Sequence, residues 1–123
     1  MAYTTFPAFA QLLLDGYAER AGGGVQRDEM DDGFVHQGPT NSLSRYERSL
    51  TYRLADVFLP GAKDEFERWR RHDLRNGALH FDWTDPAYGQ RRRVRIVGGE
   101  VEYKPLTSLF DDWSATFVIE YWE

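Results

Sequence analysis

The sequence predicts an α+β fold in which one helix packs on a mainly antiparallel β-sandwich. Apolar and polar residues alternate along several segments after residue 44, and one segment at about residues 61–75 has the periodicity of a helix. Glycine and proline separate these segments. Strands that alternate between apolar and mostly polar residues are typical of antiparallel sheets with one exposed face. The 123 residues are expected to form one domain.

The first 44 residues indicate less regular structure. Residues 9–14 fit either a short strand or a helical turn. Residues 21–33 combine three consecutive glycines with four acidic residues, a composition typical of a loop or of the tip of a hairpin. We therefore expect a Gly-rich, acidic loop or hairpin at about residues 21–38.

Residues 45–54 are predicted to form a strand with one buried face. Four apolar or aromatic residues fall on even-numbered positions, namely Tyr46, Leu50, Tyr52 and Leu54. The odd-numbered positions are polar or charged, so this side of the strand is expected to face solvent. Pro60-Gly61 ends the extended segment before the helix.

Residues 62–74 are predicted to form the amphipathic helix. Ala62, Phe66 and Trp69 follow the spacing i, i+4, i+7, and Leu74 lies on a flank of the same stripe. Acidic residues occupy the first turn and basic residues the last turn, as the helix dipole favours. Asn76-Gly77 supplies the C-terminal stop.

Three strands are predicted after the helix and before the C-terminal strand. Leu79, Phe81 and Trp83 alternate with polar residues up to Pro86. Residues 91–97 and 100–104 flank Gly98-Gly99, which predicts a tight hairpin. Residues 113–121 are predicted to form the closing strand. The predicted core consists of Tyr46, Leu50, Tyr52, Phe66, Trp69, Phe81, Trp83, Phe117 and Ile119.

Composition excludes several kinds of function. The chain has no cysteine, which rules out thiolate catalysis, disulfides and zinc ribbons. No apolar stretch approaches the length of a membrane span, so no membrane partner is expected. His72, His80, Asp82 and Asp85 are close in sequence, but helix and strand geometry gives no reason for them to converge. We expect no catalytic, cofactor or metal site, and hence no enzyme.

Two charged runs remain as candidate binding elements. The acidic run Asp28 to Asp32 lacks the alternate spacing of a calcium loop and is expected to be solvated or to face a lumen. In the basic run, Arg91, Arg93 and Arg95 share one face of a strand. Glu100 and Glu102 on the next strand are expected to pair with them across the hairpin.

Short motifs in this order resemble those of the phage minor tail protein M family, whose members are tail-tip proteins of long-tailed phages. Gly16-Tyr17 followed by Arg20 resembles the family's Gly-Tyr-x-x-Arg/Gln opening, and Phe81 to Pro86 resembles its Phe-x-Trp-x-x-Pro segment. A central strand, a helix and a closing strand with Trp113, Phe117 and Glu120 complete the series. The resemblance covers roughly residues 14–122.

The resemblance implies a non-enzymatic virion part. Its fold would be a β-sandwich of the tail-tube type with a flanking helix, assembled as a hexameric ring around the channel for DNA and the tape-measure protein. The tail tube protein and the tail-tip hub protein would be its neighbours, with only transient, non-specific contact to DNA. The resemblance also fits a distal tail-like protein, a tail terminator or a head-tail joining ring protein.

Within such a ring, acidic residues would repel phosphate and let DNA slide. The candidates for facing the channel are Asp28, Glu29, Asp31 and Asp32. The candidates for inter-subunit contacts are Arg45, Arg91, Arg93, Arg95, Glu100 and Glu102. Two functions of other classes stay open: a small hydrolase that uses Asp82 or Asp85 with His80, and a nucleic-acid-binding module that uses Arg91 to Arg95.

Overall fold

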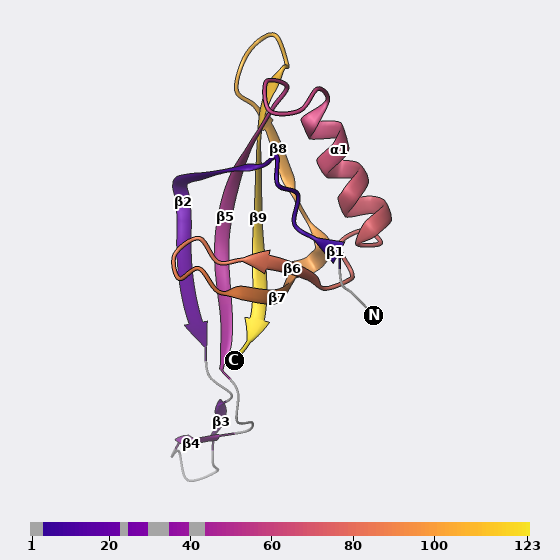
Figure 1. Ribbon diagram of the computed structural model, residues 1–123. Coiled ribbons are helices and arrows are strands. Elements are labelled where there is room, and N and C mark those ends of the chain that lie inside the picture. Colours follow the sequence, from indigo (N-terminus) through magenta and orange to yellow (C-terminus); the bar gives the residue numbers. More distant parts are fainter. Residues whose placement is uncertain (1–3, 23–24, 30–34, 40–43) are drawn as a thin grey trace.

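A computed structural model describes residues 4–22, 25–29, 35–39 and 44–123 (Figure 1). The first half contains strands β1 (Thr4–Thr5), β2 (Gln11–Gly22), β3 (Val25–Glu29), β4 (Val35–Pro39) and β5 (Arg45–Ala55). Helix α1 (Ala62–Arg68) follows and continues as a π-helical turn, Trp69–Asp73. The remaining strands are β6 (Phe81–Thr84), β7 (Arg91–Ile96), β8 (Glu102–Pro105) and β9 (Asp112–Trp122), with a 3₁₀ turn at Val97–Gly99. The predicted α+β class is confirmed.

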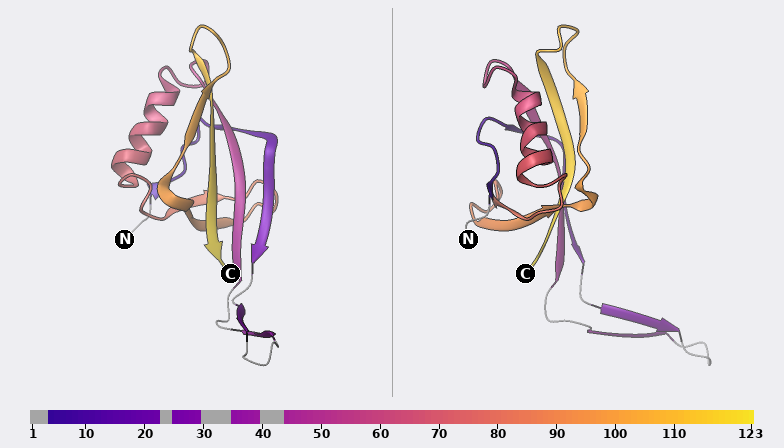
Figure 2. Two further views of the ribbon diagram at one scale, coloured as in Figure 1. Left: turned by 180° about the vertical axis from the view of Figure 1, so that it is seen from behind. Right: turned by 90° about the vertical axis from the view of Figure 1, so that its right-hand side faces the viewer.

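The strands of the body form one sheet in the order β1-β6-β7-β9-β5-β2, and β8 lies beside β9. All neighbours are antiparallel except β1 and β6. Strands β5 and β9 pair along their whole length, from Arg45 opposite Trp122 to Ala55 opposite Asp112. Figure 2 shows α1 and the β6–β7 pair on the same side of these long strands.

The core lies between the long strands and the layer formed by α1, β6 and β7. Of the predicted core residues, eight are buried as expected: Leu50, Tyr52, Phe66, Trp69, Phe81, Trp83, Phe117 and Ile119. Tyr46 is partly buried and packs against them. The ring of Phe6 adds a contact that periodicity did not predict, at centroid distances of 4.7 to 6.1 Å from five aromatic rings of this core.

The helix buries the stripe that its sequence predicts. Ala62, Phe66, Trp69 and Leu74 are all buried. The wider last turn lets the N–H of Leu74 donate to the carbonyl of Trp69 at 3.0 Å, which brings Leu74 onto the buried face. None of the helical segments among the described residues has the length and hydrophobicity needed to cross a membrane.

Two predictions for the strands are wrong. Strands β7 and β8 do not form a hairpin with each other: β7 pairs with β6 and then with β9, and β8 pairs with a different part of β9. Strands β7 and β8 both pair with the long strand β9. Pairing with this strand, which is more distant in sequence, replaces the hairpin that Gly98-Gly99 favours. Leu79, predicted to point inward, is 42% exposed because β6 begins only at Phe81.

The N-terminal region has more strand than predicted. Residues 11–22 form the long strand β2, which includes most of the segment 9–14 that fitted either a strand or a helical turn. Strands β3 and β4 pair as an antiparallel hairpin inside the predicted Gly-rich acidic segment 21–38. The hairpin alternative is therefore confirmed for residues 25–29 and 35–39.

The end of the helix is fixed by a close crossing of two glycines. A Cβ atom on Gly77 would lie 2.5 Å from the Cα of Gly99, and one on Gly99 would lie 2.4 Å from the carbonyl oxygen of Asn76. Both glycines also have positive φ angles, of 78° and 68°. Arg70 donates a hydrogen bond to the Gly99 carbonyl at 3.0 Å. The crossing therefore holds the helix against the turn between β7 and β8.

We predict that Gly99→Ala lowers the free energy of unfolding by more than about 2 kcal/mol, since the new methyl group meets backbone that cannot move away. Gly89→Ala is the matched control, because Gly89 also has a positive φ, 73°, but a Cβ atom added there would have no neighbour within 4 Å. Its cost is expected to stay near 1 kcal/mol, about that of the backbone conformation alone. Urea denaturation measures both, and equal losses would contradict the close crossing.

Candidate functional site

The sheet face that points away from α1 carries hydroxyl side chains at its centre. Ser49 and Thr51 of β5 lie opposite Val118 and Thr116 of β9. The hydroxyl oxygens of Thr51 and Thr116 are 3.2 Å apart. This open face, defined as the outward side of β5 and β9, is polar but uncharged in its middle.

Ion pairs lie at both ends of the open face. At one end, Arg53 binds Asp112 with contacts of 2.7 to 3.0 Å. At the other end, Glu120 accepts hydrogen bonds from Arg95 at 2.7 Å and from Arg45. Burial would raise the pKa of Glu120, but these two guanidinium groups hold it below its usual value. The Glu120 carboxylate therefore stays ionised, and the ion pairs with Asp112 and Glu120 neutralise the arginines within the chain.

The inner face of β5 holds a buried cation, Arg48, which is fully shielded from solvent. Its guanidinium donates to both carboxylate oxygens of Asp85, at 3.0 and 2.8 Å. It also donates to the hydroxyl oxygens of Tyr17, at 3.0 Å, and Tyr121, at 2.9 Å. Only the Nε of Arg48 has no partner among the described residues. Arg92 also binds Asp85. We call Arg48, Asp85, Tyr17, Tyr121 and Arg92 together the Arg48 cluster.

Asp85 begins the turn between β6 and β7. Its carboxylate accepts hydrogen bonds from the backbone N–H of Ala87 at 2.9 Å and from Arg92 at 3.1 Å. Burial alone would raise the pKa of Asp85, but the bonds from Arg48, the Ala87 N–H and Arg92 together lower it to about 2. The same ion pair raises the pKa of Arg48 despite burial. Asp85 is therefore charged at neutral pH, and both of its carboxylate oxygens accept hydrogen bonds.

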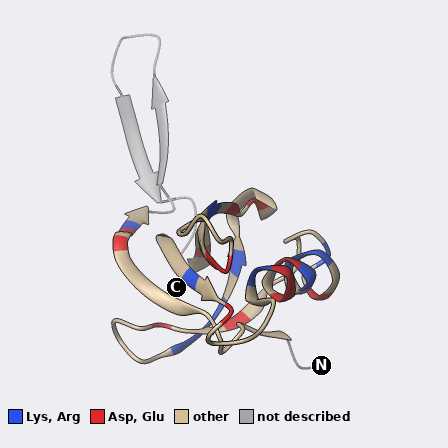
Figure 3. Ribbon diagram, turned by 90° about the horizontal axis from the view of Figure 1, so that it is seen from above, with Lys and Arg blue, Asp and Glu red and all other residues tan. Residues whose placement is uncertain are grey.

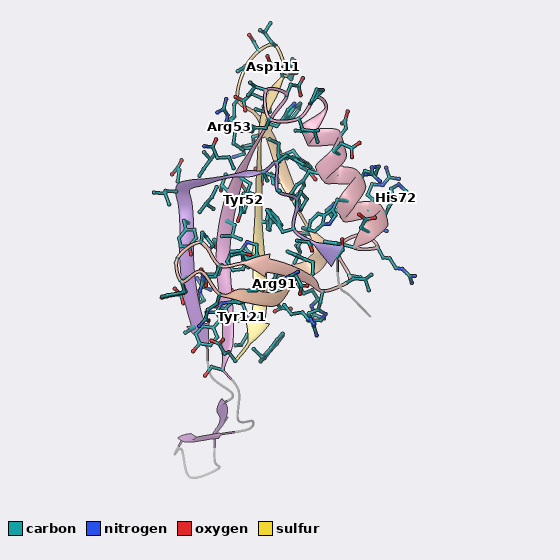
Figure 4. All side chains as sticks on the ribbon, viewed as in Figure 1. Tyr52, Arg53, His72, Arg91, Asp111 and Tyr121 are labelled. Carbon is teal, nitrogen blue, oxygen red and sulfur yellow. The ribbon has the colours of Figure 1, made fainter. Side chains whose placement is uncertain are left out.

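The Arg48 cluster joins five parts of the chain: β2 through Tyr17, β5, the turn after β6, β7 through Arg92, and β9 through Tyr121. Figure 4 places Tyr121 near the lower end of β9. Sequence reasoning missed this cluster. The one available signal was parity, because Arg48 falls on the same even-numbered side as Tyr46 and Leu50.

The predicted Arg–Glu pairs across a β7–β8 hairpin are wrong. Arg91 and Arg93 instead reach Asp82 of β6, at 3.1 and 3.9 Å, and Arg95 reaches Glu120 of β9. Glu102 lies 3.2 Å from Lys104 on its own strand. The cause is the strand order, since β7 and β8 are not neighbours. Figure 3 shows basic and acidic residues side by side in the coloured part of the chain. Whether Arg45, Arg91, Arg93, Arg95, Glu100 and Glu102 also contact other subunits stays a prediction.

The candidate channel residues fall in the acidic hairpin region. Asp28 and Glu29 belong to β3, where they lie opposite His36 and Val35 of β4. Asp31 and Asp32 lie outside the described residues. Figure 1 shows β3 and β4 beyond the lower ends of β2 and β5. Their role as a channel wall stays a prediction.

The histidine and aspartate residues considered for catalysis belong to different settings. His72 lies on the π-helical turn, at the side of the molecule away from β2 (Figure 4), and Asp85 is held by Arg48. No group of three His, Asp or Glu residues within the described ranges is arranged to hold a metal ion. An open groove of about 820 Å³ beside Gly98 is lined by Ser49, Thr116 and Val118, and not by His80, Asp82 or Asp85.

No family model, curated protein or solved structure was found to match this chain.

We predict that Asp85→Ala lowers the free energy of unfolding by about 3–5 kcal/mol, because it removes the buried counter-ion of Arg48 and leaves only the partly exposed Glu19, at 3.4 Å. Asp82→Ala is the control, since its partner Arg91 is 64% exposed. The decrease in the free energy of unfolding caused by Asp82→Ala is expected to stay below about 1 kcal/mol. Chemical denaturation measures both variants, and a small effect of Asp85→Ala would contradict the anchoring role.

Acid should weaken the fold through the same carboxylate. Folding lowers the pKa of Asp85 from 3.8 to about 2. The stabilisation that the ionised Asp85 contributes to the folded state is therefore complete above about pH 4 and is lost as the pH falls through 2. The wild type should therefore lose about 2 kcal/mol more than Asp85→Asn between pH 4 and pH 2. Denaturation curves at several pH values test this, and parallel pH profiles of the two proteins would refute it.

Proposed function

We propose that the chain is a structural component of a bacteriophage tail: a ring subunit of the minor tail or tail-tip type, related to distal tail proteins. In this role it joins the tail tube to the tip and lines the DNA channel. The observation that carries the proposal is a sheet, β2-β5-β9-β8, whose two edge strands each pair with one strand only among the described residues. A tail terminator or a head-tail joining ring is the nearest alternative.

The directions of the edge strands suit ring closure. Strand β5 is antiparallel to β2 and to β9, and β9 is antiparallel to β8. It follows that β2 and β8 run in opposite directions, so β8 of one copy beside β2 of the next would extend the antiparallel sheet. Such a contact joins two different surfaces, and repeated contacts of this kind close into a ring when the rotation fits.

An edge strand as long as β2 also favours burial in an assembly. It has 12 residues, and most of them are exposed in the single chain. Long exposed edges invite uncontrolled pairing, and proteins normally shorten or cover them. A permanent neighbour on this edge removes that hazard.

The open face has the character that a DNA channel needs. Its centre is uncharged, and the arginines at its ends are neutralised by Asp112 and Glu120. Phosphate therefore gains little by binding there, since tight DNA binding depends on cations that can replace counter-ions. We propose that the acidic residues Asp28, Glu29, Asp31 and Asp32 extend this non-adhesive wall.

The resemblance to the minor tail protein M family gains support from the Arg48 cluster. The two segments that carry it, Gly16-Tyr17 and Phe81 to Pro86, both contact Arg48, through Tyr17 and Asp85. Trp83 of the second segment also lies 5.8 Å from the guanidinium. If the chain shares the architecture of this family, residues of the two motifs are expected to meet inside the fold, as these do. On this view, the layer of α1, β6 and β7 is the second half of a tail-tube-type sandwich.

The proposal implies a hexameric ring located in the virion tail and assembled in the host cytoplasm. Its partners would be the tail tube protein, the tail-tip hub protein and the tape-measure protein, with DNA in transient contact. No catalytic residue is assigned, because the role is carried by shape and by the pairing of edges.

We predict that the purified chain forms closed rings at high protein concentration. Native mass spectrometry is expected to give one discrete oligomer, and electron microscopy particles with a central hole. A chain that remains monomeric at all concentrations would contradict the proposal. Cleavage of a small substrate that is lost in His80→Ala, with folding intact, would instead support the hydrolase alternative.

A further inference from the structure

Asn76 and Gly77, just after the π-helical turn, form the one Asn-Gly step in the sequence. In such a step the backbone nitrogen of glycine can attack the side-chain amide carbon of asparagine, because glycine carries no Cβ atom that blocks the approach. The new N–C bond closes a five-membered imide, and the side-chain nitrogen leaves as ammonia with the proton of the glycine amide. Water then opens the imide to aspartate or to isoaspartate, whose main chain has one extra methylene group. The sequence thus contains a step that can modify itself without an enzyme.

The side chain of Asn76 is accessible to this chemistry. Asn76 is exposed, whereas Gly77 is buried. Water can therefore reach the amide that is lost and can hydrolyse an imide that forms there. Any protection of this step must come from the way the fold holds the backbone of Gly77.

The nitrogen of Gly77 is engaged by the end of the helical segment. Its N–H donates a hydrogen bond to the carbonyl of Arg70 at 3.1 Å. The attack requires this proton to be lost, so the hydrogen bond must break first. The N–H of Asn76 is also bonded, to the carbonyl of Arg71 at 3.1 Å. The backbone on both sides of the reacting peptide group is therefore fixed to the helix.

The peptide group between Asn76 and Gly77 is also packed against Gly99. A Cβ atom on Gly99 would lie 2.4 Å from the Asn76 carbonyl oxygen, and one on Gly77 would lie 2.5 Å from the Gly99 Cα. Imide formation turns this peptide group towards the Asn76 side chain. That movement would displace the carbonyl oxygen or Gly77 within a contact that has no room for a methyl group. The crossing of the two glycines must therefore open before the imide can close.

We propose that Asn76 is a latent deamidation site, which the crossing of Gly77 with Gly99 keeps closed and which reacts only when the crossing opens. Isoaspartate lengthens the main chain between Asn76 and Gly77, so the crossing cannot re-form with its present geometry. Deamidation thus turns a transient opening into a permanent loss of the contact between the helix end and the turn after β7. The inference does not depend on the proposed ring, because it rests on contacts within one chain.

Mass spectrometry of the purified chain after incubation at mildly alkaline pH tests the proposal. Trypsin cleaves after Arg75 and Arg91, so the peptide 76–91 reports Asn76 separately from Asn41, the other asparagine. A sample digested before incubation corrects for deamidation during digestion. We expect Asn76 to deamidate at least about tenfold more slowly in the folded chain than in the same chain in guanidinium chloride, because the reaction must wait for local opening. Equal rates in the two states would overturn the proposal.

Two further measurements identify the crossing as the source of the protection. Gly99→Ala, which crowds the crossing, should speed deamidation of Asn76 at least about tenfold, whereas Gly89→Ala should leave the rate near that of the wild type. Hydrogen exchange of the Gly77 amide measures the opening in the wild type, without a variant that could fail to fold. Its protection factor should be of the same order as the slowing of deamidation. A Gly77 amide that exchanges freely, or one rate for Gly99→Ala and the wild type, would rule out the role of the crossing.

Discussion

The buried ion pair between Arg48 and Asp85 is the constraint on which the rest of the structure depends. Strand β5 places a guanidinium among the apolar side chains of the inner face, where an uncompensated charge would cost several kcal/mol. The turn after β6 must therefore close over β5 so that Asp85 can meet it. A slip of one residue in β5 would move Arg48 to the open face and expose Leu50 and Tyr52. The pair thus fixes the register of β5 as well as the position of the β6–β7 layer.

Elements with a strong local pattern were predictable from the sequence. The helix stripe of Ala62, Phe66 and Trp69 and the alternation of β9 depend on periodicity within a short segment, and the structure confirms both. The Arg48–Asp85 pair joins residues 37 positions apart, and no periodicity reports such a contact. The prediction of a hairpin at Gly98-Gly99 was wrong for a related reason. The glycines adopt the positive φ angles of a turn, but the edge of β9 competes for both flanking strands.

The arrangement of charge changes how the arginine-rich sequence is understood. A run such as Arg91 to Arg95 looks like a phosphate-binding element, yet the outward-facing arginines meet Asp82 and Glu120 in neighbouring strands. Arg92 points inward and meets Asp85. Arginine suits this use because its planar group binds carboxylates through several hydrogen bonds and tolerates partial burial. The arginines of this run therefore hold neighbouring strands and the turn after β6 together.

The sheet and the Arg48 cluster together would determine the size of the proposed ring. The cluster ties β2, β5 and β9 to the turn after β6, so the strand at one edge of the sheet is braced against the core. The opposite edge, β8, is joined to the same β9. Twist between adjacent strands has a preferred value, and a braced sheet cannot change it freely. The angle between the two edges is then set by the fold of one subunit. A ring built through these edges would inherit its curvature from the buried pair and not from adjustable surface side chains.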